Sequence, residues 1–322
     1  MRYTSQQRSA FALLVLGNAL IVVALVKLPG VHEDIVVAYA VVMPIALRIL
    51  FVASEQHSPR VVLDGIRVWR AIGRGEIVFH YQPKVDLATG QPVGVEALAR
   101  WKHPTKGVLP PASWLAATDL PWLEKRFLHH ALTTILTQAA TWRDRGWDLT
   151  VCINIGPRTF SDPQFALLLR GHLSRHVLPA SCVVIELTEE VLDFSPETAR
   201  VADELAALGV GLALDDFGIG HSSMDRLVRL PIRELKIDRS FVTNFTRNTR
   251  QAAVAAAAIR MAHSLGMECV AEGIEDPDCL QAMRREGCDI GQGYLISRPL
   301  PPDELDTWIE GGHWQTATVS LV

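Results

Sequence analysis

Acidic and amide residues recur near the C-terminal ends of short apolar runs in this sequence. They are Glu96 in VGVEALARW, Asn154 in TVCINI, Glu186 in VVIELTEE, Asp215 and Asp216 in GLALDDFGIG, and Glu272 in ECVAEGIE. Carboxylates are costly to bury unless they are paired or bind a cation. Because barrel enzymes keep their chemistry at strand ends, this set predicts a cation in a shared cleft.

Alternating strand-like and helix-like runs from Ile77 onward must position that set. Strands are expected at 77–87, 93–101, 150–155, 183–189, 211–217, 234–238, 268–274 and 290–296, and helices at 123–143, 164–175, 197–208, 251–265 and 278–286. Repeated βα units indicate a parallel sheet covered by helices. About eight strands in about 240 residues favour an α/β fold of the TIM-like (β/α)8 barrel type over an open doubly wound sheet.

The first sixty residues differ in composition and predict two transmembrane helices ahead of the barrel. Residues 10–26 and 35–52 are apolar, and each is about the 17 to 25 residues that cross a bilayer. Arginines precede the first stretch and follow the second, so the positive-inside rule places both ends in the cytoplasm. A cleaved signal peptide or two buried globular helices are the alternatives, but no small-residue cleavage site follows Val26.

Four segments follow from this division. Val62, Ile66 and Trp69 stand at helical spacing and predict an amphipathic connector helix. We therefore expect a membrane hairpin at 1–56, the connector at 57–76, the barrel at 77–312 and a tail at 313–322.

Charge and cysteine content narrow the functional classes. The net charge is −4 with acids and bases interspersed, which argues against binding a nucleic acid polymer and leaves a small nucleotide as a ligand. The five cysteines form no CxxC pair, and their odd number argues against a disulfide framework. The body is expected in a reducing compartment, most simply the cytoplasm.

Seven motifs, in order, resemble the EAL-domain phosphodiesterases of bacteria. They are EALARW from Glu96, INIGPRTF from Ile153, ELTEE from Glu186, DDFGIGHSS from Asp215, KIDRSFV from Lys236, AEGIE from Ala271 and GQGYLISRPL from Gly291. The resemblance implies hydrolysis of cyclic di-GMP to linear pGpG with two Mg²⁺ or Mn²⁺ ions. Because the family is bacterial, the two apolar stretches predict a multi-pass protein of the bacterial inner membrane, held by residues 10–52, with a cytoplasmic catalytic domain. A homodimer is expected by analogy with relatives.

The resemblance also assigns roles to individual residues. The ligands of one metal would be Glu96, Asn154, Glu186 and Asp215, and those of the second Asp215, Asp216 and Glu272. The catalytic set would be Lys236, which holds the attacking water or the charge on the phosphate, Glu272, and Glu189, which anchors the DDFGIG loop. Substrate would meet Arg100, which grips a phosphate, and Gln82, Leu98, Asp238 and Gln292, which line the site.

The residue types suit that chemistry. A phosphodiester is anionic and repels hydroxide until cations neutralise it, and two metals about 3.5 to 4 Å apart can do so while lowering the pKa of a bound water. A set of carboxylates and one amide, without His or Cys, favours Mg²⁺ or Mn²⁺ over Zn²⁺.

Simpler interpretations exist for single residues. A lone strand-end glutamate is usually solvated or salt-bridged, Asn154 could cap a turn, Lys236 could be a surface lysine, and Arg100 could pair with a neighbouring acid. Ile219 and His221 also depart from the usual DDFGTGYSS loop. That departure puts turnover and regulation in doubt, not metal binding.

Other functional classes fit fewer residues. A membrane-bound receptor that binds cyclic di-GMP without hydrolysing it would be expected to have lost ligands, and none is lost. An inert scaffold gains nothing from clustered negative charge. A glycosidase with two carboxylates leaves Asn154, Lys236 and the Asp215–Asp216 pair unexplained.

Overall fold

The structure is a computed structural model that describes residues 59–189, 195–218 and 224–312. The chain divides into two compact units. The smaller unit takes Met1–Arg70 and Trp114–Leu123, and the larger takes Ala71–Ser113 and Glu124–Val322. All the site residues predicted from sequence fall in the larger unit.

The smaller unit contains most of helix α3 (Pro59–Gly73) and the 3-10 helix η2 (Leu115–Asp119). Helix α3 lies where the connector was expected. Its buried positions include Val62 and Val68, whereas Trp69 is 44% exposed, so Trp69 does not belong to the buried face as the spacing had suggested. Within the described part of the chain, no helix is both long and apolar enough to cross a bilayer. The expected spans at 10–26 and 35–52 lie outside that part, as does the tail.

The described residues of the larger unit contain one nine-stranded sheet in the order β1-β9-β8-β7-β6-β5-β4-β2-β3, and a further β1–β2 pairing closes it into a barrel. The strands are β1 (Ile77–Asp86), β2 (Pro92–His103), β3 (Gly107–Leu109), β4 (Thr150–Asn154), β5 (Val183–Thr188), β6 (Gly211–Phe217), β7 (Glu234–Ile237), β8 (Glu268–Ala271) and β9 (Ile290–Gly291). The closed barrel confirms the predicted α/β class.

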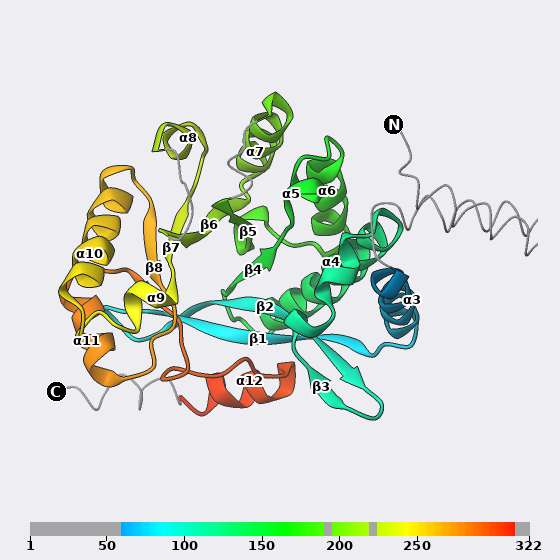
Figure 1. Cartoon of the computed structure of the whole chain (residues 1–322), viewed down its shortest axis with the longest axis horizontal. Helices are drawn as coiled ribbons and strands as arrows, with labels where there is room; N and C mark the ends of the chain where they lie inside the picture. The colour runs from blue at the N-terminus through cyan, green and yellow to red at the C-terminus, as the bar shows by residue number, and fades with distance from the viewer. Residues whose placement is uncertain (1–58, 190–194, 219–223, 313–322) are drawn as a thin grey trace, which may run out of the picture. The chain divides into compact units, whose positions relative to one another are not determined.

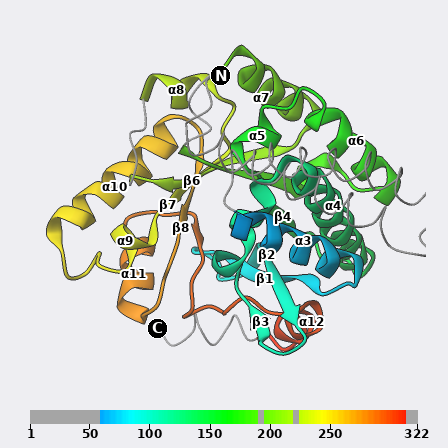
Figure 2. The same cartoon turned by 45° about the vertical axis from the view of Figure 1, so that its right-hand side comes forward.

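Helices surround these strands (Figures 1 and 2). They are α4 (Pro121–Asp144), α5 (Pro157–Phe160), α6 (Phe165–His176), α7 (Pro196–Leu208), α8 (Met224–Arg229), α9 (Arg239–Val242), α10 (Thr249–Ser264), α11 (Pro277–Arg285) and α12 (Pro302–Glu310), with the 3-10 helices η1 (Pro111–Ser113) and η3 (Ala180–Cys182). Helix α10 packs on β7 and β8, α7 on β6, and α12 on β1.

The expectation of a uniformly parallel sheet is wrong at the first strand. Strand β1 runs antiparallel to both β2 and β9. The cause is the short link between β1 and β2, because a parallel connection needs a dozen or more residues. Asp86 shapes that link by accepting hydrogen bonds from the backbone N–H and the hydroxyl of Thr89, and Gly90 adopts a φ of 76°.

The last predicted strand is also shorter than expected. Strand β9 covers Ile290–Gly291 instead of the whole run 290–296. Beyond the strand the chain passes close to Ile274, and a Cβ at Gly293 would overlap the backbone of that residue. The chain turns away at this close approach, which only glycine permits.

Candidate active site

Lys236 of β7 lies at the centre of a group of carboxylates. Its Nζ lies 2.7 Å from Glu272 Oε1, 3.1 Å from Glu186 Oε1, 3.2 Å from Asp215 Oδ1 and 3.8 Å from Glu96 Oε2. The lysine side chain is only 1% exposed. Residues that are far apart in sequence therefore meet at one buried ammonium group.

Strand register brings these side chains together. Asn154 of β4 pairs with Glu186 of β5, and Lys236 of β7 pairs with Val270 of β8, just before Glu272. Alternate residues of a barrel strand point inward, so positions in neighbouring register reach the same interior layer. The middle of each strand is buried and apolar, at 151–153 in β4, 183–185 in β5 and 269–271 in β8.

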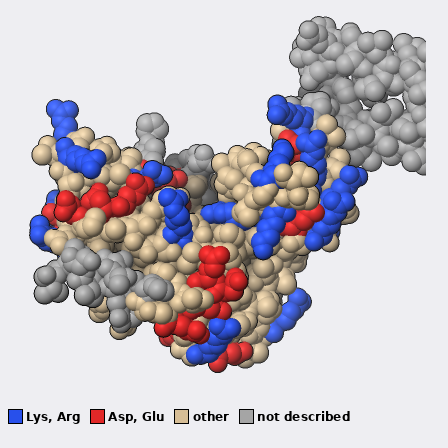
Figure 3. All heavy atoms as spheres, turned by 90° about the horizontal axis from the view of Figure 1, so that it is seen from below, with Lys and Arg blue, Asp and Glu red and all other residues tan. Residues whose placement is uncertain are grey.

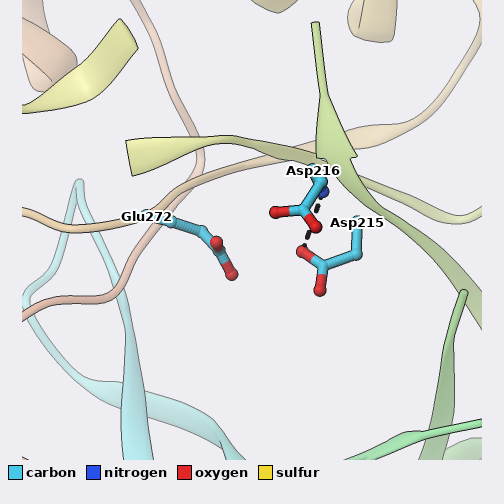
Figure 4. Close-up of side chains that lie close together, drawn as sticks. All are labelled: Asp215, Asp216 and Glu272. Carbon is cyan, nitrogen blue, oxygen red and sulfur yellow. Dashed lines mark hydrogen bonds between the residues drawn. The ribbon is translucent and has the colours of Figure 1, made fainter. Parts of the chain in front are cut away.

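Asp216 breaks the alternation of β6. Its φ is 57°, and the β6–β7 register shifts between Leu214 and Phe217. This left-handed conformation lets two successive aspartates serve one site, as expected for a pair at a strand end. The backbone N–H of Asp216 donates to Asp215 Oδ1 over 3.0 Å, and the carboxylate of Glu272 points toward the pair (Figure 4). One ligand oxygen from each of Asp215, Asp216 and Glu272 lies within 4.8 Å of the others.

Amide side chains hold Glu96 of β2 in place. Asn154 Nδ2 donates to Glu96 Oε1 over 2.9 Å, and Gln292 Nε2 donates to Glu96 Oε2 over 2.6 Å. Gln292 also donates to Gln82 Oε1, and Gln82 Nε2 donates to the carbonyl of Ser297. Burial alone would raise the pKa of Glu96, but Lys236 and the amide donors outweigh it and hold the pKa below its usual value.

Glu186 and Glu272 show the reverse effect on the pKa. Burial and the nearby charge of Glu96 raise the pKa of Glu186 well above its usual value. Burial raises the pKa of Glu272 to about 7 despite the contact with Lys236. Burial also disfavours the charge on Lys236, yet Glu186 and Glu272 keep its pKa well above the usual value. One ammonium therefore does not compensate all of these acids.

The residues present fit a divalent cation. Neither carboxyl oxygen of the fully buried Glu186 accepts a hydrogen bond from the described residues, although Oε1 lies close to Lys236. Buried polar atoms normally have partners. Four carboxyl groups face one lysine here, with Asp216 beside them, and their hard oxygen donors match Mg²⁺ or Mn²⁺. These ions would be held by Glu96, Asn154, Glu186, Asp215, Asp216 and Glu272.

The remaining predicted residues lie farther out. Glu189 Oε1 accepts a hydrogen bond of 3.1 Å from the backbone N–H of Gly218, at the start of the DDFGIG loop. Arg100 is partly buried and donates to the carbonyl of Ala99, and burial lowers its pKa. Asp238 accepts from the backbone N–H of Ser240 and so caps α9. Ile219 and His221 lie outside the described residues.

A cleft of about 210 Å³ opens beside the carboxylates. Its lining residues are Gln82, Glu96, Leu98, Asp215, Arg239, Glu272, Gly273, Glu275, Gln292, Gly293 and Tyr294. Sequence reasoning missed Arg239, Glu275 and Tyr294, although each stands inside a quoted motif. Arg239 faces Glu275 at 3.7 Å, and the Arg298 guanidinium lies 4.2 Å from the ring centre of Tyr294. The sequence signal that could have identified these three residues was their position next to predicted site residues within the same motifs.

Charged side chains of both signs lie on the surface of the molecule. On the face drawn in Figure 3, acidic and basic side chains are interspersed, and among the described residues no broad basic field covers it.

Comparisons with known proteins bear on the whole barrel. The EAL domain profile matches residues 67–299. The bifunctional diguanylate cyclase/cyclic di-GMP phosphodiesterase MucR of Pseudomonas aeruginosa is 35% identical over 238 residues, covering 73% of this chain and 35% of MucR. The cyclic di-GMP phosphodiesterase RocR of the same species is 34% identical over 245 residues, covering 76% of this chain and 62% of RocR. The chain therefore spans about a third of MucR and more of RocR.

Solved structures agree with the sequence comparisons. The MucR phosphodiesterase in complex with cyclic di-GMP superposes with a TM-score of 0.71 at 34% identity, covering 76% of this chain and 99% of that one. The EAL enzyme Bd1971, bound to cAMP and cyclic di-GMP, gives a TM-score of 0.74 at 26% identity, covering 84% and 75%. With this match to most of its barrel, the chain belongs to the EAL domain family.

Proposed function

We propose that this chain hydrolyses a phosphodiester bond of cyclic di-GMP to give linear pGpG, using two divalent ions, Mg²⁺ or Mn²⁺. The observation that carries the proposal is the convergence of four carboxylates within 4 Å of Lys236, with Glu186 buried and without a hydrogen bond from the described residues. Relatives named as cyclic di-GMP phosphodiesterases support the choice of substrate.

Each part of the site has a distinct task in this proposal. Bound divalent ions would polarise the phosphodiester and make a bound water acidic enough to supply hydroxide. Asn154 and Gln292 fix the orientation of Glu96, so this ligand needs no reorganisation when substrate arrives. Lys236 remains charged and stabilises the negative charge that grows on the phosphate oxygens.

Residues around the cleft would bind and orient the substrate. Arg100 would pair with a phosphate, since its partly buried guanidinium donates to the neutral carbonyl of Ala99 and keeps its positive charge for an anion. Gln82, Leu98 and Gln292 line the cleft itself. Asp238 adds negative charge close to Asp216, whose pKa is raised by burial and by Asp215 and Asp238. Glu189 would hold the following loop through Gly218.

The location of the protein is a further part of the proposal. The two apolar stretches at 10–26 and 35–52 support anchoring in the bacterial inner membrane. The arginines at both ends of this region favour a cytoplasmic barrel. A homodimer remains an expectation by analogy with relatives.

Turnover by the purified full chain tests the function. Cyclic di-GMP is incubated with Mg²⁺ or Mn²⁺, and nucleotides are separated by chromatography. We expect pGpG from the wild type, none after chelation, and loss of turnover in Glu96→Ala. Glu310→Ala, an exposed residue of α12, is the matched control and should keep the wild-type rate. Binding without any turnover would instead support the non-hydrolysing receptor.

A further inference from the structure

A second polar layer lies beneath the carboxylates. Alternate residues of barrel strands share the interior, so the positions two residues from Lys236, Asn154 and Gln82 on the same strands form the next layer toward the other barrel mouth. These positions are Glu234 on β7, Cys152 on β4 and Lys84 on β1. On β1 the second layer is reached by going forward in sequence, from Gln82 to Lys84, because β1 runs antiparallel to β2.

Lys84 and Glu234 form an ion pair across this layer. The Lys84 ammonium donates to the Glu234 carboxylate and lies 3.1 Å from Cys152 Sγ. The two side chains are 0% and 2% exposed. The pair joins β1 to β7 across 150 positions of sequence.

Stability alone gives a weak reason for such a pair. Removing two charges from water costs about as much as their attraction returns, and apolar residues of the same volume are often as stable. A role in the neighbouring site is a stronger reason. Cys152, whose Sγ lies 3.1 Å from the Lys84 ammonium, is the register partner of Glu96 and stands two residues before Asn154, so the pair lies next to the layer of carboxylates.

Glu234 is the member of the pair that reaches the opposite mouth of the barrel. Glu234 lines a cavity of about 350 Å³ at the opposite mouth, together with residues that include Thr150, Arg284 and Ile290. Lys84 is not among the residues that line that cavity, and its ammonium contacts Glu234 and Cys152. The Glu234 carboxylate, which the Lys84 ammonium contacts directly, cancels most of the field of that ammonium.

We propose that Glu234 is a positioning residue for the candidate metal centre: it neutralises the buried Lys84 ammonium beneath Glu186 and thereby sets the affinity of the centre for divalent cations. The inference rests on the metal centre of the proposed function but not on the identity of the substrate. Without Glu234, an uncompensated positive charge would lie under the ligands and repel any cation they hold, because charges interact strongly in a buried medium.

Mn²⁺ binding without substrate tests this inference. The full chain is titrated by calorimetry, with Mn²⁺ as the only probe. We expect Glu234→Gln to weaken binding about tenfold. Adding Lys84→Met to Glu234→Gln removes the excess charge at similar volume and should restore affinity to within about threefold of the wild type. Glu268→Gln, a half-exposed acid of the same cavity, is the matched control and should bind like the wild type.

The charge-keeping variant Glu234→Asp covers the case in which Glu234→Gln does not fold. It should lower the unfolding midpoint through imperfect packing while keeping Mn²⁺ affinity. The inference is overturned if Glu234→Gln binds like the wild type, if the double variant fails to regain affinity, if Glu234→Asp loses it, or if the wild type binds no Mn²⁺. A wild type that binds Mn²⁺ but leaves cyclic di-GMP intact would contradict the proposed function alone.

Discussion

The barrel interior contains two buried lysines in very different surroundings. Lys236 faces four carboxylates within 4 Å, whereas Lys84 is paired with one, Glu234. Both side chains are almost completely buried. The two layers therefore differ in charge balance and not in burial.

This difference separates a functional layer from a balanced one. Around Lys84 one positive charge meets one negative charge, so no further ion is needed to balance them. Around Lys236 the acids exceed the bases, because four carboxylates lie within 4 Å of one ammonium. Burial, with neighbouring acids adding to it, raises the pKa values of Glu186 and Glu272. A bound divalent cation would balance the excess negative charge. We therefore assign the chemistry to the layer of carboxylates around Lys236.

Removing Lys236 should have the largest effect on turnover. Lys236→Met deletes the ammonium that lies within 4 Å of four carboxylates and the group that stabilises charge on the phosphate. Turnover of cyclic di-GMP should fall about 100-fold or more at saturating metal. Steady-state kinetics measure it, with the exposed Lys102→Met of β2 as control.

The same variant also tests charge balance without substrate. Metal-free Lys236→Met should unfold at a lower temperature than the metal-free wild type, since the acids then repel one another without compensation. Added Mn²⁺ should recover most of the loss in a calorimetric scan. Equal midpoints in chelator for both proteins would show that the acids do not depend on this lysine.

The pH dependence of metal-free stability should give the next largest effect. The pKa of Glu272 is raised from 4.5 to about 7 in the folded protein, so between these values the folded state binds more protons than the unfolded state. The stability of the folded protein therefore falls as pH rises. Glu272 causes no loss of stability below pH 4.5 and the full loss above about pH 7. The loss is on the order of 3 kcal/mol for such a shift.

Urea unfolding in chelator, from pH 4.5 to 8, measures that loss. Subtracting the profile of Glu272→Gln isolates the contribution of Glu272, because the amide does not titrate. With saturating Mn²⁺ the decline should disappear or reverse, since metal displaces the proton. A difference profile that rises with pH in chelator would contradict the excess of negative charge.

The smallest expected effect concerns Asp238 at the rim. Its carboxylate caps α9 through Ser240, and loss of a cap costs about 1 kcal/mol. Asp238→Ala should therefore lower stability by that amount, while Asp238→Asn keeps the cap. If Asp238 also contacts substrate, KM rises in both variants; a KM change in Asp238→Ala alone would mean that only the cap matters.

The sequence allowed most of the barrel to be predicted, because apolar runs, helix periodicity and motif order are local signals. Its main error was the direction of β1, which depends on the length of a single turn. The grouping of Glu96, Asn154, Glu186, Asp215 and Glu272 followed from a simple rule, that parallel strands carry their ends to one mouth.

Other features left no local trace. The left-handed backbone of Asp216 arises from a register shift between β6 and β7. The Lys84–Glu234 pair joins residues 150 positions apart, and neither stands out from its strand in sequence. Pairing across a barrel is a property of the closed fold, so periodicity could not reveal it.

Crystals of the protein soaked with Mn²⁺ and measured by anomalous diffraction would test the central claim most directly. The account predicts two anomalous peaks about 3.5 to 4 Å apart, both within bonding distance of Asp215, one toward Glu186 and the other toward Glu272. Peaks elsewhere on the molecule, or none beside Lys236 at saturating Mn²⁺, would contradict it.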